Sequence, residues 1–372
     1  MGRKICAWLG WILAAILLYF FENNTGTRAV LLISLLVPLL SMGCARMAAK
    51  RMTVTLQAPE SVQAGESIRC KAQAHMTGWA AGCSAAWVLT GCNRLTGETF
   101  ETEIHPDGRG DCVFEVESRR CGLIRLAVSC TEVRDWFALT KIRRDIRAEA
   151  SVLVEPALYP VVLSAEPDNG ACSREEGGNH RRAADPEPGN LREYMPGDDI
   201  RRIHWKLSEK LDRTMIRESV PEALDMPALL LETVFPGETD PEAMHAAARG
   251  LLSVSHAMAA EGISHAVFTA DGTGTACTEV DDDADFYGAE QQVLTAVCTS
   301  GGADAGTLFS RETEDIRFRH VIVFSPHPGT DLSLTAERQP VTLVLPPFVP
   351  FAGAEAGIRV TTLDPADAAI DI

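Results

Sequence analysis

Two uncharged, apolar stretches stand close together at the start of this chain, at residues 5–21 and 29–45. Each is 17 residues long, near the ~17–25 residues that a helix needs to cross a bilayer. A polar link of seven residues, 22–28, joins them. So short a link predicts a transmembrane helical hairpin over residues 1–51, with both outer ends on one side of the membrane. Everything after residue 51 then lies on that side.

Basic residues indicate which side this is. Arg3 and Lys4 precede the first stretch, and residues 46–51 add three more bases, whereas the link carries one. The positive-inside rule therefore predicts a multi-pass protein of the cell membrane whose soluble domains are cytoplasmic. A cleaved signal peptide is the rival interpretation of the basic start. No small-x-small cleavage site follows Phe21, and a second apolar stretch comes at once.

The region 52–156 has the pattern of an all-β sandwich. Short β-prone segments alternate with turn signals such as Ala64-Gly65-Glu66 and Thr96-Gly97-Glu98. The expected strands are residues 54–56, 67–72, 85–89, 112–116 and 123–128. Strands of this length and spacing favour two packed sheets. Residues 157–190 follow as a linker or mobile loop, because 168–190 are polar, rich in Gly and Pro, and without periodicity.

Residues 191–372 are expected to form an α/β domain. After residue 227, continuous apolar runs typical of buried parallel strands alternate with helical patterns. The expected strands are 228–234, 263–269, 320–325 and 341–345, with helices at 242–261 and 289–298. This order predicts a doubly wound sheet with helices on both faces.

Residues 191–206 hold an unusually dense mixture of charges and aromatic rings. Pro196-Gly197 indicates a tight turn, and Asp198 follows it where a short helix could begin. One interpretation is a solvated, charged loop. The other is a fixed ion network next to Trp205.

This segment resembles the signature of the domain of unknown function 58 family, whose members are bacterial membrane proteins with a von Willebrand factor A-like C-terminal domain. The matching residues are Arg192, Tyr194, Gly197, Asp198, Arg201, Ile203, Trp205 and Lys206, followed by Arg217 and Glu218 on a later strand. Residues 135–139 also resemble the family's Asp-Pro-Phe-Gly-Leu element, with Trp136 and Ala138 departing from it. The resemblance implies a MoxR-type AAA+ ATPase as partner, often beside a transglutaminase-like membrane protein.

We expect the signature to hold the soluble domains together. Arg201 would pair with Asp198 or another buried acid, and Trp205 would be largely buried against the A-like sheet.

The A-like resemblance also raises the question of a metal. Active A domains carry Asp-x-Ser-x-Ser after their first strand, and the matching positions here read Glu232-Thr233-Val234-Phe235-Pro236. Only Glu232 offers a carboxylate, and the two serine positions lack oxygen ligands. The sequence therefore predicts a degenerate site without metal, and no cofactor.

His245, His256 and His265 are too spread out for a ligand set and are expected at the surface or at helix caps. The 11 cysteines show no zinc spacing and are expected to be free thiols, with disulfides as the minor alternative.

Charge excludes one function class for the α/β domain. Between residues 218 and 304 there are sixteen acids and one base, Arg249, which argues against nucleic-acid binding and suits a basic protein partner.

Two classes of function remain for the protein. The first, which we favour, is a non-enzymatic, membrane-anchored interaction or scaffold protein acting with a MoxR-type ATPase. The alternative is an enzyme with its site within residues 192–206, using Asp198, Asp199 or His204 as acid or base. Nearby bases would hold those carboxylates ionised, and no nucleophile is paired with a base.

Overall fold

The computed structural model describes residues 2–22, 24–75, 84–106, 111–164, 191–195, 203, 205, 208–209, 213–217, 222–235, 240–270, 274–301, 305–314, 316–351 and 357–371. The chain divides into two compact units. The first consists of Met1–Ala157, Thr239–His245 and Leu294–Cys298, and the second of Leu158–Glu238, Ala246–Val293 and Thr299–Ile372.

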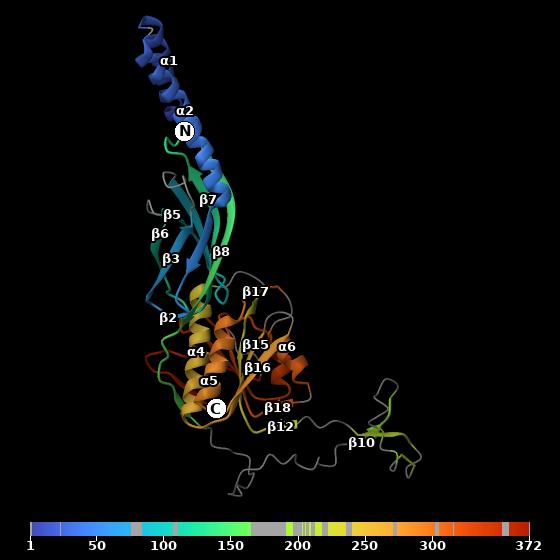
Figure 1. Ribbon diagram of the computed structural model, residues 1–372. Coiled ribbons are helices and arrows are strands. Elements are labelled where there is room, and N and C mark those ends of the chain that lie inside the picture. Colours follow the sequence, from blue (N-terminus) through green and yellow to red (C-terminus); the bar gives the residue numbers. More distant parts are fainter. Residues whose placement is uncertain are drawn as a thin grey trace. The chain divides into compact units, whose positions relative to one another are not determined.

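The first unit begins with two antiparallel helices, α1 (Gly2–Phe21) and α2 (Thr25–Arg51) (Figure 1). Both are long and apolar enough to cross a membrane, judged by length and composition. Their large apolar side chains, among them Leu13, Phe20 and Leu36, point into solvent. A core helix of a soluble protein would bury such residues, because exposing them to water is costly. The two apolar helices expected from the sequence are therefore present.

The second half of α2 has one buried face. Ser41, Cys44, Ala45, Ala48 and Ala49 are all buried, and their spacing of three and four residues places them on one side of the helix. The alanines belong to the same apolar core as the strands that follow. The end of α2 is thus part of the β-rich body of this unit.

Two sheets form that body. The three-stranded sheet has the order β1-β3-β6 and the five-stranded sheet the order β2-β8-β7-β4-β5 in the described part of the chain. Their bounds are β1 (Thr53–Gln57), β2 (Ser61–Gln63), β3 (Ser67–His75), β4 (Ser84–Asn93), β5 (Thr99–Ile104), β6 (Asp111–Glu117), β7 (Gly122–Arg134) and β8 (Lys141–Glu155). Ile68 of the smaller sheet and Trp87, Leu126 and Val152 of the larger one share a single core. The five strands expected from the sequence are confirmed, whereas β8, the longest, was not expected.

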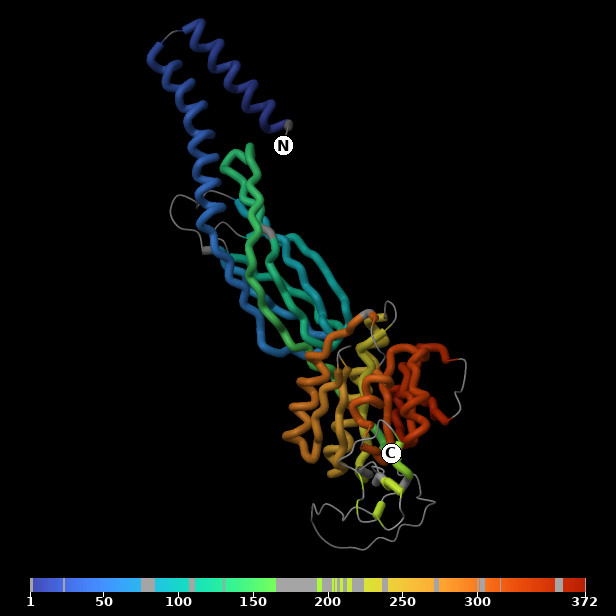
Figure 2. Tube along the Cα trace, turned by 90° about the vertical axis from the view of Figure 1, so that its right-hand side faces the viewer, coloured from blue at the N-terminus to red at the C-terminus, as the bar shows by residue number. Residues whose placement is uncertain are grey.

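β7 and β8 form a long antiparallel hairpin that runs beside α2 (Figure 2). Its register pairs Arg134 with Lys141 at the tip and Gly122 with Val154 at the base.

The second unit contains a six-stranded sheet, counted over its described residues, with the order β16-β15-β13-β19-β20-β21. All neighbours are parallel except β16, which is antiparallel to β15 at the edge. The bounds are β13 (Ala228–Leu231), β15 (His265–Ala270), β16 (Thr275–Val280), β19 (Val321–Phe324), β20 (Val341–Leu345) and β21 (Ile358–Thr362). The four strands expected from the sequence are confirmed.

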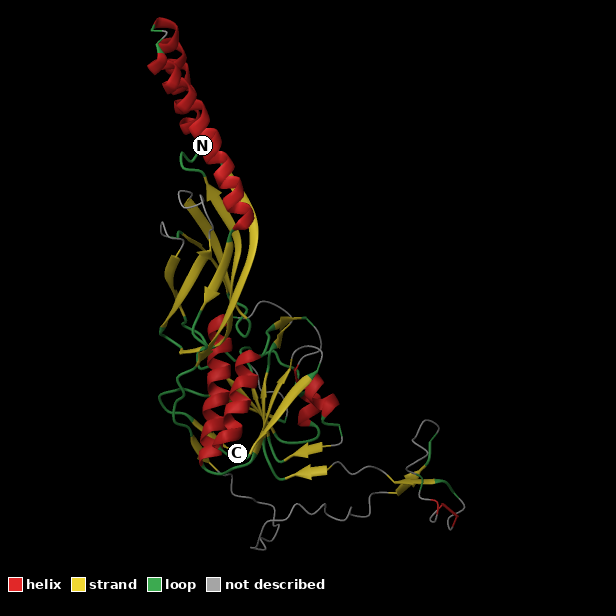
Figure 3. Cartoon of the chain, in the orientation of Figure 1, coloured by secondary structure: helices red, strands yellow, loops and turns green. Residues whose placement is uncertain are grey.

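Helices lie on both faces of this sheet (Figure 3). On one side are α4 (Pro241–Ala260), with its Gly250 against Phe324 of β19, and α5 (Asp283–Thr295). On the other are α6 (Ala305–Glu312) and α7 (Ser333–Ala336), where Phe309 packs with Leu230 and Phe268. Both expected helices are found, although α5 begins six residues before the expected start at Ala289.

Short strand pairs complete the second unit. β9 (Val162–Ser164) pairs with β22 (Ala369–Asp371), β10 (Leu191–Glu193) with β11 (Met215–Arg217), β12 (Glu222–Leu224) with β18 (Ile316–Phe318), and β14 (Val234–Phe235) with β17 (Thr299–Ser300). β9 lies in the stretch expected to be a linker, so at least part of that stretch has regular structure. Residues 165–190 of it lie outside the described residues.

Candidate functional site

The signature segment forms a small antiparallel pair where it is described. Leu191, Arg192 and Glu193 of β10 face Arg217, Ile216 and Met215 of β11, so Arg192 and Arg217 stand on adjacent strands. The Tyr194 N–H extends the pair by donating to the Thr214 carbonyl at 2.8 Å. Glu193 and Arg213 form an exposed ion pair at 3.8 Å, a type that contributes little stability.

Most of the remaining signature residues lie outside the described part of the chain. These are Gly197, Asp198, Arg201, Lys206 and Glu218, together with the side chains of Arg192 and Arg217. Ile203 is half-buried. The expectation that Trp205 is buried is wrong, because 67% of its side chain is exposed. An exposed indole buries too little apolar surface to hold two domains together, so this ring is available to an external contact.

A second group of polar residues gathers at the carboxyl ends of the central parallel strands. Glu232 follows β13 directly and Ser325 follows β19 directly. The chain runs from β13 to one side of the sheet and later to the other, so β13 and β19 flank the topological switch point. Doubly wound sheets bind ligands at this point.

Glu232 is 1% exposed and accepts a hydrogen bond from the Thr330 hydroxyl. Thr330 Oγ1 also lies 3.0 Å from the hydroxyl of Ser325, which in turn donates to the His327 carbonyl at 2.6 Å. The Thr330 hydroxyl reaches Glu232 from the segment after β19, and the Ser325 hydroxyl contacts Thr330. The local sequence around Glu232 reveals neither of them.

These groups do not fit a divalent cation. A hard cation takes six or more oxygens, whereas the described side chains here supply one carboxylate and two hydroxyls. The Thr330 hydroxyl points its hydrogen at Glu232, and Val234 lies in the apolar core. No group of three or more acidic, imidazole or thiol side chains gathers as a metal site among the described residues. The arrangement instead satisfies a buried carboxylate from within the chain.

One histidine near this sheet is deeply buried. His265, at the start of β15, is 0% exposed, so its expected place at the surface is wrong. Its Nδ1 lies 2.9 Å from the Ile263 carbonyl and its Nε2 lies 2.7 Å from the Ser255 hydroxyl. The carbonyl can only accept, so Nδ1 carries the proton and Nε2 accepts from Ser255. Burial lowers the pKa of His265, which keeps the imidazole neutral.

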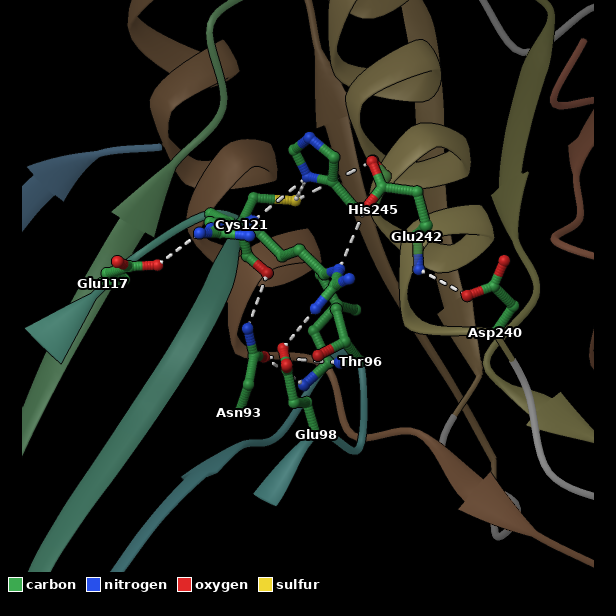
Figure 4. A network of polar contacts seen from close by, with 11 residues as sticks. Asn93, Thr96, Glu98, Glu117, Cys121, Asp240, Glu242 and His245 are labelled. Carbon is green, nitrogen blue, oxygen red and sulfur yellow. Dashed lines mark hydrogen bonds and ion pairs between the residues drawn. The ribbon is translucent and has the colours of Figure 1, made fainter. Parts of the chain in front are cut away.

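The first unit contains a polar network around the start of α4 (Figure 4). His245 Nδ1 lies 3.2 Å from the thiol of Cys121 and accepts the Cys121 N–H at 3.1 Å. Arg120 binds Glu98 at 2.7 Å and Glu242 at 3.0 Å. The hydrogen bond to Glu98, and then that to Glu242, hold the Arg120 pKa above its ordinary value.

The cysteine–histidine pair in this network resembles a nucleophile and its base, but its geometry does not suit catalysis. Cys121 is 0% exposed, so no substrate can reach its sulfur. Asn93 Nδ2 fixes the Cys121 carbonyl at 3.0 Å, and the Asn93 Oδ1 accepts the N–H groups of Leu95 and Thr96. The network is a structural attachment of the first turn of α4. Among the cysteines whose side chains the structure describes, none forms a disulfide bond.

Exposed acids gather at one edge of the second unit. Glu261, Glu279, Asp281, Asp283 and Asp285 are all exposed where α4 ends, β16 ends and α5 begins. These three ends meet beside the start of β15. There the charge of Asp281 offsets part of the lowering of the His265 pKa by burial. Asp282 caps α5 by accepting the N–H groups of Ala284 and Asp285. We refer to the five exposed acids as the acidic edge.

Taken together, these features define a protein with two apolar N-terminal helices, a β-rich unit and an α/β unit. Residues 190–255 match the family described as "Protein of unknown function DUF58". In this segment the chain is similar to the domain of unknown function 58 family. No curated protein matches the chain.

Among solved structures, the CARDB domain of a Pyrococcus furiosus protein, crystallised in complex with di-metal ions, resembles part of the chain. The match has 15% identity and a TM-score of 0.18, and it covers 28% of this chain and 86% of that domain. A likeness this slight has no bearing on fold or function.

Proposed function

We propose that this protein is a membrane-anchored, non-enzymatic interaction protein whose α/β unit docks a basic partner. By family resemblance, that partner is a MoxR-type AAA+ ATPase, with a transglutaminase-like membrane protein as a further member of the assembly. The observation that carries the proposal is the contrast within the second unit. Its strand-end carboxylate is buried and bound by Thr330 of the same chain, whereas the five acids of the acidic edge are all exposed.

Anchoring by α1 and α2 is supported by their exposed apolar surfaces and by their pairing. Trp11 Nε1 donates to the Ser34 hydroxyl at 3.0 Å, and Trp8 Nε1 lies 3.4 Å from the Ser34 carbonyl. Polar groups that bond between two helices are a typical means of association within a bilayer. The bases that flank this helical hairpin favour a cytoplasmic location for both units.

The proposed architecture is a β-sandwich followed by a von Willebrand A-like domain. The shared core of the two sheets supports the first part. For the second part, the support is a parallel sheet with one antiparallel edge strand and an acidic residue directly after its central strand. In this arrangement the degenerate strand end at Glu232 works without metal.

Charge reversal tests the docking proposal. We expect the variant Glu279→Lys, Asp281→Lys, Asp283→Lys to lose most of its capture of the purified ATPase, because a basic partner is then repelled. The matched control is Glu101→Lys, Glu103→Lys, Glu149→Lys, which reverses three exposed acids of the first unit. Both full-length variants would be compared with the native chain in detergent, at low and high salt. Unchanged capture by the first variant, or an equal loss in the control, would refute a role for the acidic edge.

Topology is tested separately with a reporter fused after Ile372. We expect cytoplasmic reporter activity, because five of the six bases in the first 51 residues flank the helical hairpin on that side. Activity that depends on export would overturn the orientation.

A further inference from the structure

The tip of the β7–β8 hairpin is a rigid loop that presents two aromatic rings. The Asp135 carboxylate accepts the N–H groups of Phe137, at 3.2 Å, and Thr140, and it also binds the Thr140 hydroxyl at 3.0 Å. Asp135 is 2% exposed, whereas Trp136 and Phe137 are 40% and 46% exposed. The loop is thus built around a buried acid, with its largest apolar side chains pointing outward. Such a fixed pair of exposed rings is typical of a contact surface.

This tip is bonded to α2. The Trp136 N–H donates to the Ser41 hydroxyl at 3.0 Å, and the Ser41 hydroxyl donates to Asp135 at 3.4 Å. Ser41 lies inside the uncharged stretch of α2, residues 29–45. The hairpin therefore extends along α2 as far as the stretch proposed to cross the membrane (Figure 2).

The position of α1 shows how deep in the bilayer Ser41 of α2 would lie. Trp11 bonds to Ser34. Seven residues from Ser34 toward the end of α2 lead to Ser41, and seven residues from Trp11 toward the start of α1 lead to Lys4. Both helices rise about 1.5 Å per residue, so Ser41 and Lys4 stand at about the same height. In Figures 1 and 2 the start of α1 likewise lies close to the hairpin tip. Because Arg3 and Lys4 begin the charged end of α1, this height is the boundary between headgroups and acyl chains.

Bases lie on the hairpin just below the tip. Arg134 and Lys141 each approach Glu132 to 2.8 Å, and Arg143 approaches it to 3.7 Å. Three bases around one acid leave the group positive. The hydrogen bond from Lys141, followed by that from Arg134, holds the pKa of Glu132 below its ordinary value, so the acid stays charged. Arg46 and Lys50 of α2 are exposed in the same part of the unit. Bases next to exposed aromatic rings match an anionic bilayer surface, where negatively charged headgroups lie next to the apolar acyl chains.

We propose that the β7–β8 tip is a lipid contact, with Trp136 and Phe137 in the boundary between headgroups and acyl chains and the bases below them on anionic headgroups. The contact fixes the height and tilt of the first unit against the bilayer, which the two helices alone would leave free. This inference rests on the membrane anchoring proposed above.

Difference fluorescence in nanodiscs tests the contact. The full chain and its Trp136→Phe variant are reconstituted into discs of phosphatidylcholine and phosphatidylglycerol, with or without bromine on the acyl chains. The emission lost on substitution is the Trp136 signal, and we expect brominated chains to quench most of it. Trp136→Phe retains an aromatic ring, and near-ultraviolet circular dichroism would verify its fold.

Two matched controls separate the possible outcomes. Trp205→Phe removes an exposed indole of the second unit, and its signal should be insensitive to brominated lipid. Trp11→Phe reports on α1, and its signal should be quenched. A Trp136 signal that is quenched by aqueous acrylamide and not by brominated lipid, while the Trp11 signal is quenched by lipid, would overturn the tip contact alone and place Trp136 in water. Failure to quench Trp11 would overturn the anchoring as well.

Discussion

The two units each contain a buried carboxylate, and the two carboxylates are held in different ways. Asp135 is bound by the residues of its own loop, from Phe137 to Thr140, and by Ser41. Glu232 is bound by Thr330, which lies 98 residues further along the chain. A short turn motif can encode the first arrangement, whereas only the completed sheet creates the second. The comparison predicts that damage to Asp135 stays local to the hairpin, while damage around Glu232 spreads over β13 and β19.

The largest expected effect follows removal of the Asp135 carboxylate. Asp135→Ala leaves the N–H groups of Phe137 and Thr140 without their acceptor, and hydrogen bonds to a charged group are worth about 1.5–3 kcal/mol each. We expect the β7–β8 hairpin to lose about 3 kcal/mol of stability. Hydrogen exchange of the detergent-solubilised full chain would show this as faster exchange of β7 and β8 amides. Asp135→Asn, which keeps one acceptor, should lose less; equal losses would show that a single neutral acceptor cannot replace any part of the carboxylate's role.

A smaller loss is expected in the second unit. Thr330→Val conserves shape but removes the hydroxyl that binds Glu232, and loss of one hydrogen bond to this buried carboxylate costs about 1–3 kcal/mol. Exchange should accelerate at both β13 and β19. Thr330→Ser retains the hydroxyl and serves as the matched control. Acceleration confined to the loop that carries Thr330 would contradict the proposed dependence of the sheet on this contact.

Acid should weaken the second unit through His265. Burial holds its folded pKa below the ordinary value of 6.5, so the unfolded chain binds the proton more readily. The stability is therefore complete above pH 6.5 and declines as the pH falls from there toward the folded pKa, by at most about 1.4 kcal/mol per pH unit. Exchange at β15 measured across this range would follow the decline. His265→Gln should flatten it, and an unchanged slope in that variant would assign the effect to another group.

The smallest expected effect is a gain. Ala138, in the Asp135 loop, has a φ of 53°, a left-handed conformation that is strained for any residue with a Cβ. Ala138 also stands at the position where the similar family element, Asp-Pro-Phe-Gly-Leu, has glycine. Ala138→Gly should stabilise the hairpin by up to about 1 kcal/mol. Thermal unfolding of the full chain, with β7–β8 exchange as the local measure, would detect it. A loss of stability would indicate that the alanine methyl group makes a contact worth more than the strain.

Local patterns in the sequence predicted most of the fold. The buried run at residues 228–231 and the alternation at 123–128 each identify a strand, because each places apolar side chains at the period of its structure. β8 was missed because its first half, including Lys141, Arg143 and Asp145, is exposed and charged. β16 was missed because Thr275 to Val280 forms an edge strand with few apolar residues.

The candidate sites were less predictable, because their members meet only through tertiary structure. Nothing near Glu232 indicates Thr330 or Ser325, and nothing near Cys121 indicates His245, which follows it by 124 residues. Trp205 was expected in the interior because the signature was expected to hold the soluble domains together, yet it is exposed. Local charge density alone could not distinguish a fixed network from a surface.

The first unit is assembled from chain segments that lie far apart in the sequence, and this determines when it can finish folding. Besides Met1–Ala157 it includes Thr239–His245 and Leu294–Cys298, and the Cys298 N–H donates to the Arg94 carbonyl at 2.9 Å. A ribosome that adds about 5–20 residues per second needs roughly 7–30 s to translate the roughly 140 residues between Ala157 and Cys298. During that time the first unit lacks two of its three segments. A gene cut after residue 157 would make that unfinished state permanent, so dissection of this protein should keep residues 1–298 together.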